Sequence, residues 1–461
     1  MEEARASRPM WWAVQDVCSA VVALCAEDDM LAVALTCRAL CNAARAARPR
    51  GLATARSAIT SSLARLEWGL TLGAPLDALT FAAAARAGNT RVLTRLHAAG
   101  AAPDARAVAA AARAGHLDAL AWLAAAGVLS RDEGAASAAA DGGHAHVLQW
   151  LRAKGCAWSE ATAAAAAGGG HLAVLKWVFA DRRVAVDERA AARAAAGGHL
   201  DVLCWLRARG APWDASALAG AAAGGHLDVL RWLRGAQPPC PWDEGAPARA
   251  ARAGHARVVH WLHDEGCPGV LRAPTLAGAA ESGDIELVLW LCARGCALDA
   301  SACARAAGAG HGAALAELRR LGCEWDSATC REAARGGHVA ILEWALERDC
   351  PCDSLAWAHA AARGHVATLD VLRARGCARS PRAALLAARG GHVNALQWLR
   401  DDGFAWDAHI LAAAALGGHL DALHWLRERG CPWGRHARAA AARGPNAAAV
   451  CKWLDEHGCP V

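Results

Sequence analysis

Histidine is the first residue type in this chain that could carry chemistry. The 461 residues include 20 histidines, enough to suggest catalysis or metal binding. Most of them occupy one position of a short repeated unit, so successive rings should lie one helix spacing apart, about 8–10 Å. Two imidazoles at that separation cannot both ligate a zinc ion at about 2.0–2.1 Å. We therefore interpret these histidines as structural, repeat-defining residues that hydrogen-bond to backbone at a helix start: His116, His144, His171, His199, His226, His255, His311, His338, His365, His392 and His419.

Cysteine is the second such residue type, because 19 thiols could form disulfides or metal sites. Seven of them follow a glycine at the same point of the repeat: Cys156, Cys267, Cys296, Cys323, Cys377, Cys431 and Cys459. Equivalent atoms about 8–10 Å apart exceed the roughly 7 Å limit for Cα atoms joined by a disulfide. The chain has no CxxC pair, and Cys350-Pro-Cys352 is an isolated signal. We expect reduced, packed thiols, with no metal and no cofactor.

Tryptophan falls into two groups by repeat position. One group lies in the second predicted helix, where we interpret the indoles as filling the core: Trp122, Trp150, Trp177, Trp205, Trp232, Trp261, Trp290, Trp344, Trp398, Trp425 and Trp453. The other group precedes the first predicted helix: Trp158, Trp213, Trp242, Trp325, Trp406 and Trp433. Two interpretations of this second group remain open. The indoles cover the helix start, which we favour, or they are exposed aromatic residues that bind a ligand.

No catalytic motif is present in the sequence. The Gly-Gly pairs recur as helix stops rather than as a phosphate-binding loop, and no nucleophile–base motif is found. We therefore predict that the chain is not an enzyme. The net charge is +5 and the arginines are spread through the repeats, from which we expect no nucleic-acid partner. No apolar run is long enough for a membrane span and the first residues lack a signal-peptide pattern, so we expect a cytoplasmic or nuclear protein that is not secreted and has no membrane partner.

A unit that recurs from about residue 80 to the C-terminus positions all these residues. Residues 224–234, Gly-Gly-His-Leu-Asp-Val-Leu-Arg-Trp-Leu-Arg, are one copy. Fourteen copies align on Asn89, the eleven histidines named above, Asp284 and Asn446, with numbers that differ by 27 to 29 from one to the next. A short fixed period is typical of a solenoid.

Each copy should form a helical hairpin. Asp214 or Ser216 can cap an alanine-rich first helix, and the Gly-Gly pair ends it because glycine adopts the left-handed conformation of a helix C-cap. A second helix should run from Leu227 to about Arg234 and is apolar on several sides, so neighbouring copies must bury it. The sequence therefore predicts an all-α solenoid of about 14 short repeats. Exposed first-helix positions, such as Ser216, Thr329 and His409, are candidate contacts with a target, but the target-binding residues are not identified.

Two features of the unit resemble an ankyrin repeat. Gly-His-Leu-Asp-Val-Leu, followed by an apolar pair and a glycine, is similar to the second ankyrin helix, and Ala-Ala-x-Gly-Gly is similar to the end of the first. The resemblance covers roughly residues 76–461. The copies are shorter than the ankyrin period of about 33, and Cys-Pro-Trp-Asp at 240–243 stands near where Thr-Pro-Leu-His opens the ankyrin first helix. The resemblance implies an ankyrin-like solenoid whose surface binds proteins, shortened in the β-turn finger.

Residues 11–50 differ from the repeats and resemble an F-box, a small helical module that docks onto the Skp adaptor of cullin-type ubiquitin ligases. The matching residues, which the resemblance implies are adaptor contacts, are Val17, Val21, Leu24, Leu31, Leu35, Cys37, Arg38 and Leu40. The Leu-Pro that opens the family is replaced by Val14-Gln15-Asp16. The alternative is a plain helical cap for the solenoid. Around this module we expect a flexible tail at 1–10 and a linker with a half-repeat cap at 51–75.

Together the two resemblances imply a substrate-recruiting adaptor of a ubiquitin ligase, with a Skp-type partner at 11–50 and a protein target on the repeats. The alternative is a binding scaffold, or a competitive inhibitor of a host protein, with no ligase connection. The short repeats also resemble the ankyrin families of giant DNA viruses of amoebae (Pandoravirus-like), which implies a host protein as target, in the host cytoplasm. We expect a monomer.

Overall fold

The computed structural model of the chain describes residues 59–71, 78–129, 133–180, 187–434, 436–444 and 446–459. The chain forms two compact units, residues 1–217 and 218–461, and the division falls within one helix. The predicted tail at 1–10 and F-box-like module at 11–50, with all eight of its predicted adaptor contacts, lie outside the described residues. So does most of the predicted linker at 51–75, except for residues 59–71.

The first unit is a stack of helical hairpins preceded by one helix. That helix, α5 (Leu63–Thr71), contacts α7. The hairpins pair α6 (Ala78–Arg86) with α7 (Thr90–Ala98), α8 (Ala105–Ala114) with α9 (Leu117–Ala125), α10 (Gly134–Asp141) with α11 (Ala145–Ala153), α12 (Glu160–Gly168) with α13 (Leu172–Val178), and α14 (Glu188–Ala196) with α15 (Leu200–Ala208).

The second unit continues the same pattern from α16 (Ala215–Gly224), in which the division between units falls, paired with α17 (Leu227–Gly235). Its further hairpins are α18 (Ala246–Arg252) with α19 (Ala256–Asp264), α20 (Ala273–Ser282) with α21 (Ile285–Ala293), α22 (Ala300–Ala309) with α23 (Gly312–Arg320), α24 (Ser327–Gly336) with α25 (Val339–Leu346), α26 (Ser354–Ala362) with α27 (Val366–Ala374), α28 (Ala383–Arg389) with α29 (Val393–Asp401), α30 (Ala408–Gly417) with α31 (Leu420–Glu428), and α32 (Ala437–Ala441) with α33 (Ala447–Glu456).

Helices α6 to α33 thus form fourteen hairpins, and the prediction of an all-α helical-hairpin solenoid is confirmed. The hairpin of α24 and α25 shows why these residues fold this way. The Asp326 side chain caps α24 by accepting a hydrogen bond from the Ala328 N–H at 2.9 Å. Gly337 ends the helix with φ 72°, a conformation that glycine adopts without steric cost.

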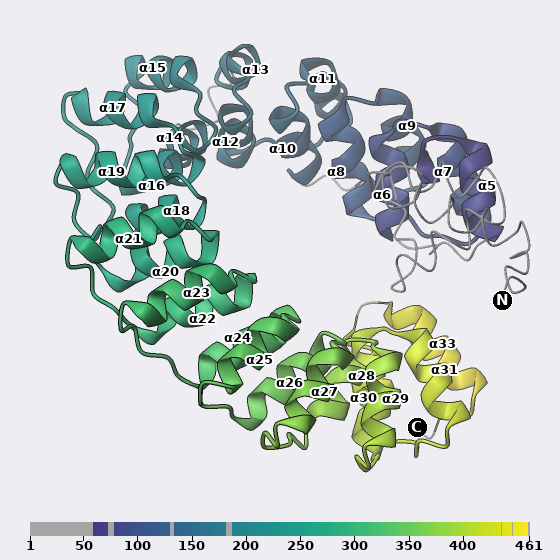
Figure 1. Cartoon of the computed structure of the whole chain (residues 1–461). Helices are drawn as coiled ribbons and strands as arrows, with labels where there is room; N and C mark the ends of the chain where they lie inside the picture. Colours follow the sequence, from purple (N-terminus) through teal and green to yellow (C-terminus); the bar gives the residue numbers. More distant parts are fainter. Residues whose placement is uncertain are drawn as a thin grey trace, which may run out of the picture. The chain divides into compact units, whose positions relative to one another are not determined.

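Within each unit the hairpins form two layers, with the first helices (even numbers) in one layer and the second helices (odd numbers) in the other (Figure 1). Alanines such as Ala333 and Ala334 are fully buried between first helices and let these helices approach closely, whereas successive second helices touch at few points. The core between the layers consists of aliphatic side chains such as Val229, Leu230 and Leu233, all 0 % exposed. This arrangement leaves one exposed side of every first helix free to carry function.

Candidate functional site

The Gly-Gly-His turn brings each repeat histidine against the preceding hairpin. A Cβ placed on Gly337 would lie 2.7 Å from the ring of His365, a distance that real Cβ atoms essentially never show. The imidazole therefore packs directly on the glycine backbone. The same contact joins Gly88 to His116, Gly115 to His144, Gly143 to His171, Gly170 to His199, Gly225 to His255, Gly283 to His311, Gly310 to His338, Gly364 to His392 and Gly391 to His419.

Several of these rings also hydrogen-bond to a carbonyl at the end of the preceding first helix. His171 Nε2 lies 3.0 Å from the carbonyl oxygen of Asp141. The corresponding distance is 3.2 Å from His338 to Gly308 and 3.1 Å from His365 to Arg335. Similar bonds join His199 to Gly168 and His392 to Ala362, both at 3.0 Å. Because a carbonyl only accepts, Nε2 must carry the proton. Each of these histidines thus links two hairpins, and its repeat-defining role stays a prediction.

Burial affects the charge state of two of these rings. Desolvation lowers the pKa of His144, and the neighbouring histidines lower it further, while a hydrogen bond to the Arg113 carbonyl opposes the shift. Desolvation likewise lowers the pKa of His392, against a hydrogen bond to the Ala362 carbonyl. Both rings are therefore neutral at pH 7, as a donor to a carbonyl in a packed contact should be.

Of the eleven tryptophans predicted to fill the core, ten are half-buried and Trp453 is buried, at 5 % exposure. Trp325, before α24, packs edge-to-face on Trp344 of α25, with ring centroids 5.7 Å apart. The Arg319 guanidinium lies 4.2 Å from the Trp325 centroid, and that of Arg348 lies 4.5 Å from the Trp344 centroid. We call this arrangement the Arg–Trp stack. It recurs, in whole or in part, with Arg152, Trp158 and Trp177; with Arg400, Trp406, Trp425 and Arg429; and with Arg427, Trp433 and Trp453.

Because arginines and neighbouring indoles cover them, these indoles offer little free aromatic face to a ligand. The core itself is filled by leucine, for example Leu342 at 0 % exposure.

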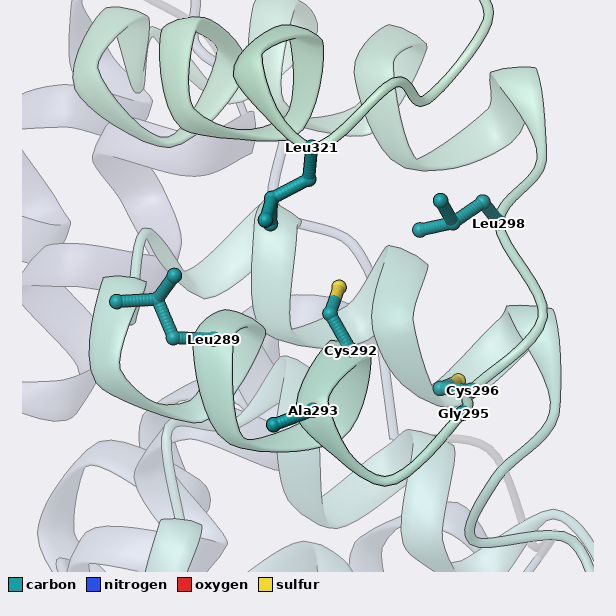
Figure 2. Close-up of a pocket in the computed structure, with 7 residues that line it drawn as sticks. All are labelled: Leu289, Cys292, Ala293, Gly295, Cys296, Leu298 and Leu321. Atoms are coloured by element: carbon teal, nitrogen blue, oxygen red, sulfur yellow. The ribbon is translucent and has the colours of Figure 1, made fainter.

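An apolar groove lies where the Arg–Trp stack is interrupted. By repeat position, Cys292 stands in place of the first arginine, Leu298 in place of the loop tryptophan, and Leu321 in place of the second arginine. Together with Leu289, Ala293, Gly295 and Cys296 they line the groove (Figure 2). Leu289 is 37 % exposed and Leu298 is 41 % exposed. None of the seven lining residues carries a charge, so the groove has no group suited to acid–base chemistry.

The first helices carry a stripe of arginine on their exposed side. The residues 10, 6 and 3 positions before the aligned histidine fall within about 60° of one another around a helix. Arginine occupies twelve of these positions, and all twelve are exposed: Arg86, Arg106, Arg113, Arg189 and Arg193 in the first unit, and Arg249, Arg252, Arg305, Arg335, Arg382, Arg389 and Arg443 in the second. Only three acids occupy them: Asp141, Glu281 and Glu332. We call this set the first-helix stripe.

The first-helix stripe makes the charge of the chain asymmetric. Its excess of nine positive charges is larger than the net charge of +5 of the whole chain, so the remaining residues are net negative. Sequence reasoning missed this feature because it took arginines spread through the repeats as unclustered. In a solenoid, a constant register in every repeat brings distant residues into one row. The signal was present in the alignment of the copies.

Part of the stripe is neutralised by acids and part is not. In the second unit Glu281 lies 3.0 Å from Arg252 and 3.9 Å from Arg305, and Glu332 pairs with Arg335 at 2.5 Å. Arg382 and Arg389, beside Arg363 at the end of α26, are exposed and have no acidic partner among the described residues. In this unit the stripe arginines without an acidic partner among the described residues are therefore Arg382, Arg389 and Arg443.

The three first-helix residues predicted to contact a target differ in their exposure. Thr329, a predicted contact, is 0 % exposed and cannot touch a target, whereas Ser216 and His409 are exposed. Among the described residues, no group of three or more His, Cys, Asp or Glu side chains could hold a metal ion. Within the same part of the chain, no helix is long and apolar enough to cross a membrane.

The fold and the stripe define a class, an all-α helical-hairpin repeat protein whose first helices carry a basic face in each unit. Solved structures to which the chain is similar include pentatricopeptide repeat proteins. PPR10 in complex with an 18-nucleotide psaJ RNA element has 16 % sequence identity and a TM-score of 0.31, over 93 % of this chain and 67 % of that chain. PPR10 from maize has 14 % identity and a TM-score of 0.30, over 97 % of this chain and 78 % of that chain. No protein-family model and no curated protein matches the chain.

These findings correct the family predictions made from the sequence. The ankyrin and F-box resemblances are wrong, because no family model matches the chain. The attribution to giant-virus ankyrin families falls with them. The ubiquitin-ligase adaptor, the protein-binding scaffold and the Skp-type partner rested on those resemblances and are withdrawn. The exclusion of a nucleic-acid partner is also wrong, since it rested on the dispersal of arginines that the first-helix stripe overturns.

Proposed function

We propose that the chain binds a single-stranded polynucleotide, RNA or DNA, along the first-helix stripe. The observation that carries the proposal is the excess of nine positive charges on that stripe in a chain whose other residues are net negative. Such an asymmetry directs a polyanion to one face and repels it from the others. Arginine suits the task because its planar guanidinium donates two parallel hydrogen bonds to a phosphate and can stack on a base.

The width of the stripe favours a single strand over a duplex. The arginines occupy an arc of about 60° on each helix, and successive helices are about 8–10 Å apart. A single strand can follow such a narrow row, with its backbone tracked by cations and its bases free to stack. The binding is expected to be mainly electrostatic, hence strongly dependent on salt.

The proposed activity is binding without catalysis. We place the protein in the cytoplasm or the nucleus, which the free thiols support. Twelve of the described cysteines, among them Cys204, Cys267 and Cys296, carry free thiols, as expected in a reducing compartment.

The test is a fluorescence-anisotropy titration of the full chain with a labelled 24-nucleotide RNA of mixed sequence, in 50 to 200 mM salt. DNA of the same sequence, the corresponding RNA duplex and heparin are parallel ligands. The key variant is Arg382→Gln/Arg389→Gln. It should weaken single-strand binding about tenfold and reduce the slope of log K against log salt by about 1.4, because each contact with a single-stranded phosphate contributes about 0.7.

The matched control is Arg231→Gln/Arg257→Gln, which removes the same charge from exposed arginines of the second helices α17 and α19. It should change the affinity less than twofold. An equal loss in both variants, an affinity for heparin equal to that for the single strands, or no binding to RNA or DNA at 50 mM salt would overturn the proposal.

A further inference from the structure

A carboxylate of the second unit lies between two arginines of the first-helix stripe. Glu281 is near the end of α20, Arg252 is the last residue of α18, and Arg305 lies in the middle of α22. Glu281 Oε2 accepts a hydrogen bond from Arg252 Nε at 3.0 Å and lies 3.9 Å from Arg305 Nη1. One carboxylate oxygen thus joins three successive first helices. We call these three residues the ion triad.

Close packing of the backbone places Glu281 beside Arg252. Gly278 lies three residues before Glu281 in α20, and a Cβ added to it would be 2.6 Å from the Ala248 oxygen and 3.0 Å from the Arg252 backbone nitrogen. Glycine is unfavourable inside a helix, and the close approach of α18 and α20 explains its presence here. Residues three apart share one side of a helix, so the approach at Gly278 brings the Glu281 side chain to the end of α18.

The ion triad has the geometry of an anion site that the protein itself fills. An arginine guanidinium binds a carboxylate and a phosphate through the same pair of N–H groups. The triad has a net charge of +1, whereas Arg252 and Arg305 without the carboxylate have +2. The three side chains are between 30 % and 52 % exposed, and exposed ion pairs are screened by water and weakly held. A phosphate can therefore take the place of the carboxylate.

We propose that Arg252 and Arg305 form a phosphate-binding subsite of the first-helix stripe, and that Glu281 occupies this subsite until a strand displaces it. The inference rests on the proposed function and adds to it the residue that limits affinity at α18 to α22. The ligand is a phosphodiester group of the single strand. The first unit has a similar contact, in which Asp141 of α10 lies 2.8 Å from Arg113 of α8. This carboxylate also joins two neighbouring first helices at stripe positions.

The test is a fluorescence-anisotropy titration of the full chain with the labelled 24-nucleotide RNA in 100 mM salt. Glu281→Gln keeps the size of the side chain and removes its charge. It should tighten binding about fivefold, the upper range for an exposed ion pair, because Arg252 and Arg305 no longer have to be released. The matched control is Glu286→Gln, which removes one negative charge from an exposed position of the second helix α21. The control should change the affinity less than twofold.

A double-mutant cycle separates release of the arginines from a general change in charge. In the background Arg252→Gln/Arg305→Gln, Glu281→Gln should change the affinity less than twofold, because no arginine remains to be released. Equal tightening in both backgrounds, or equal tightening by Glu281→Gln and Glu286→Gln, would overturn the subsite. Weaker binding by Glu281→Gln would refute it as well, since the carboxylate would then position the arginines for the strand.

A second variant and a measurement of folding complete the test. Asp141→Asn should also tighten binding, with Asp118→Asn on the second helix α9 as its control. Thermal unfolding followed by circular dichroism reports whether each variant keeps its fold. A lower melting temperature with unchanged affinity would make Glu281 a structural residue and contradict the subsite. Failure of the wild type and of every variant to bind RNA at 50 mM salt would overturn the proposed function itself, whereas normal binding that Glu281→Gln leaves unchanged would overturn only the subsite.

Discussion

At the scale of single residues, the repeat histidine links neighbouring hairpins through two properties of its ring. It offers a flat ring to a glycine backbone and, in several hairpins, one N–H to a carbonyl of the same neighbour. Asn446 stands at the equivalent position of the last copy and also reaches the preceding hairpin, with Nδ2 3.4 Å from the Gly418 oxygen. The hydrogen bond can therefore be kept without the ring, and the two contributions can be measured separately.

Substitution of His338 separates them. His338→Ala removes both the hydrogen bond and the ring contact, and should lower the free energy of unfolding by about 1–2 kcal/mol. His338→Asn retains the bond and should lose about half as much. The measurement is urea unfolding followed by circular dichroism at pH 7.5. Equal losses in the two variants would show that the hydrogen bond contributes nothing.

Two half-buried histidines also predict a pH dependence of stability. The pKa values of His144 and His392 are lowered by burial in the folded chain. Below about pH 6.5 the unfolded chain therefore binds more protons than the folded one. The stability is complete above that pH and is lost as the pH falls from about 6.5 toward the folded pKa values. Urea midpoints measured between pH 7.5 and 5.5 should fall with pH, and the fall should be shallower in His392→Asn. A flat profile, or an equally steep one in the variant, would contradict the assignment.

At the scale of the elements, the turn between helices depends on two different properties of glycine. Gly391 has φ 72° and a Cβ there would lie 2.5 Å from the His419 ring. Gly403, at the end of the paired second helix, has φ 85° with nothing within 4 Å of an added Cβ. The two glycines therefore share left-handed backbone, but only Gly391 is in a packed contact.

Alanine substitutions at Gly391 and Gly403 separate the cost of the packed contact from the cost of the left-handed backbone. Gly403→Ala should cost only the left-handed strain, about 1–2 kcal/mol. Gly391→Ala should cost that strain plus displacement of the His419 ring, at least about 1 kcal/mol more. Thermal and urea unfolding of both variants test the difference. If Gly403→Ala is as destabilising as Gly391→Ala, the histidine–glycine contact does not set the requirement for glycine.

The interruption of the Arg–Trp stack predicts substitutions that stabilise the chain. The apolar groove exists because Cys292, Leu298 and Leu321 stand where other copies carry arginine or tryptophan. Cys292→Arg/Leu298→Trp should restore a stacked arginine and indole, fill the groove, and raise the free energy of unfolding by about 1–2 kcal/mol. Leu298→Trp alone should gain less, because no guanidinium covers the indole. A lower melting temperature in the double variant would mean that the groove does not accept the stack.

The sequence predicted the elements well and the surfaces poorly, for a physical reason. Helix boundaries follow from local features, the Asp326 cap and the left-handed Gly337, and these are visible in one copy. The exposure of a side chain depends on how copies stack, so second-helix tryptophans were assigned to the core although Trp344 and Trp398 are half-buried. Prediction of the first-helix stripe requires knowledge of the helical register and of the layer to which each helix belongs. Family resemblance supplied neither, and led to the wrong partner.

At the scale of the whole molecule, the repeat positions that carry charge affect polyanion binding more than the net charge does. A chain with a net charge of +5 over 461 residues would not be expected to bind polyanions strongly. The repeat collects positive charge on the first helices and leaves the remainder net negative, so each unit has one face suited to a polyanion. In the second unit this face includes seven stripe arginines on or beside its first helices.

A row of cations that extends over many hairpins predicts that affinity depends on ligand length. In the second unit, first helices about 8–10 Å apart give each added hairpin further phosphate contacts, so a 6-nucleotide strand covers only part of the stripe. Binding should therefore tighten from 6 to 12 to 24 nucleotides, and the salt slope should steepen in the same order because more counterions are released. Competition against a labelled 24-nucleotide RNA in 50 to 200 mM salt measures both. A local pocket would instead bind all three lengths with the same affinity and the same salt slope, and that result would rule out a stripe-wide interface.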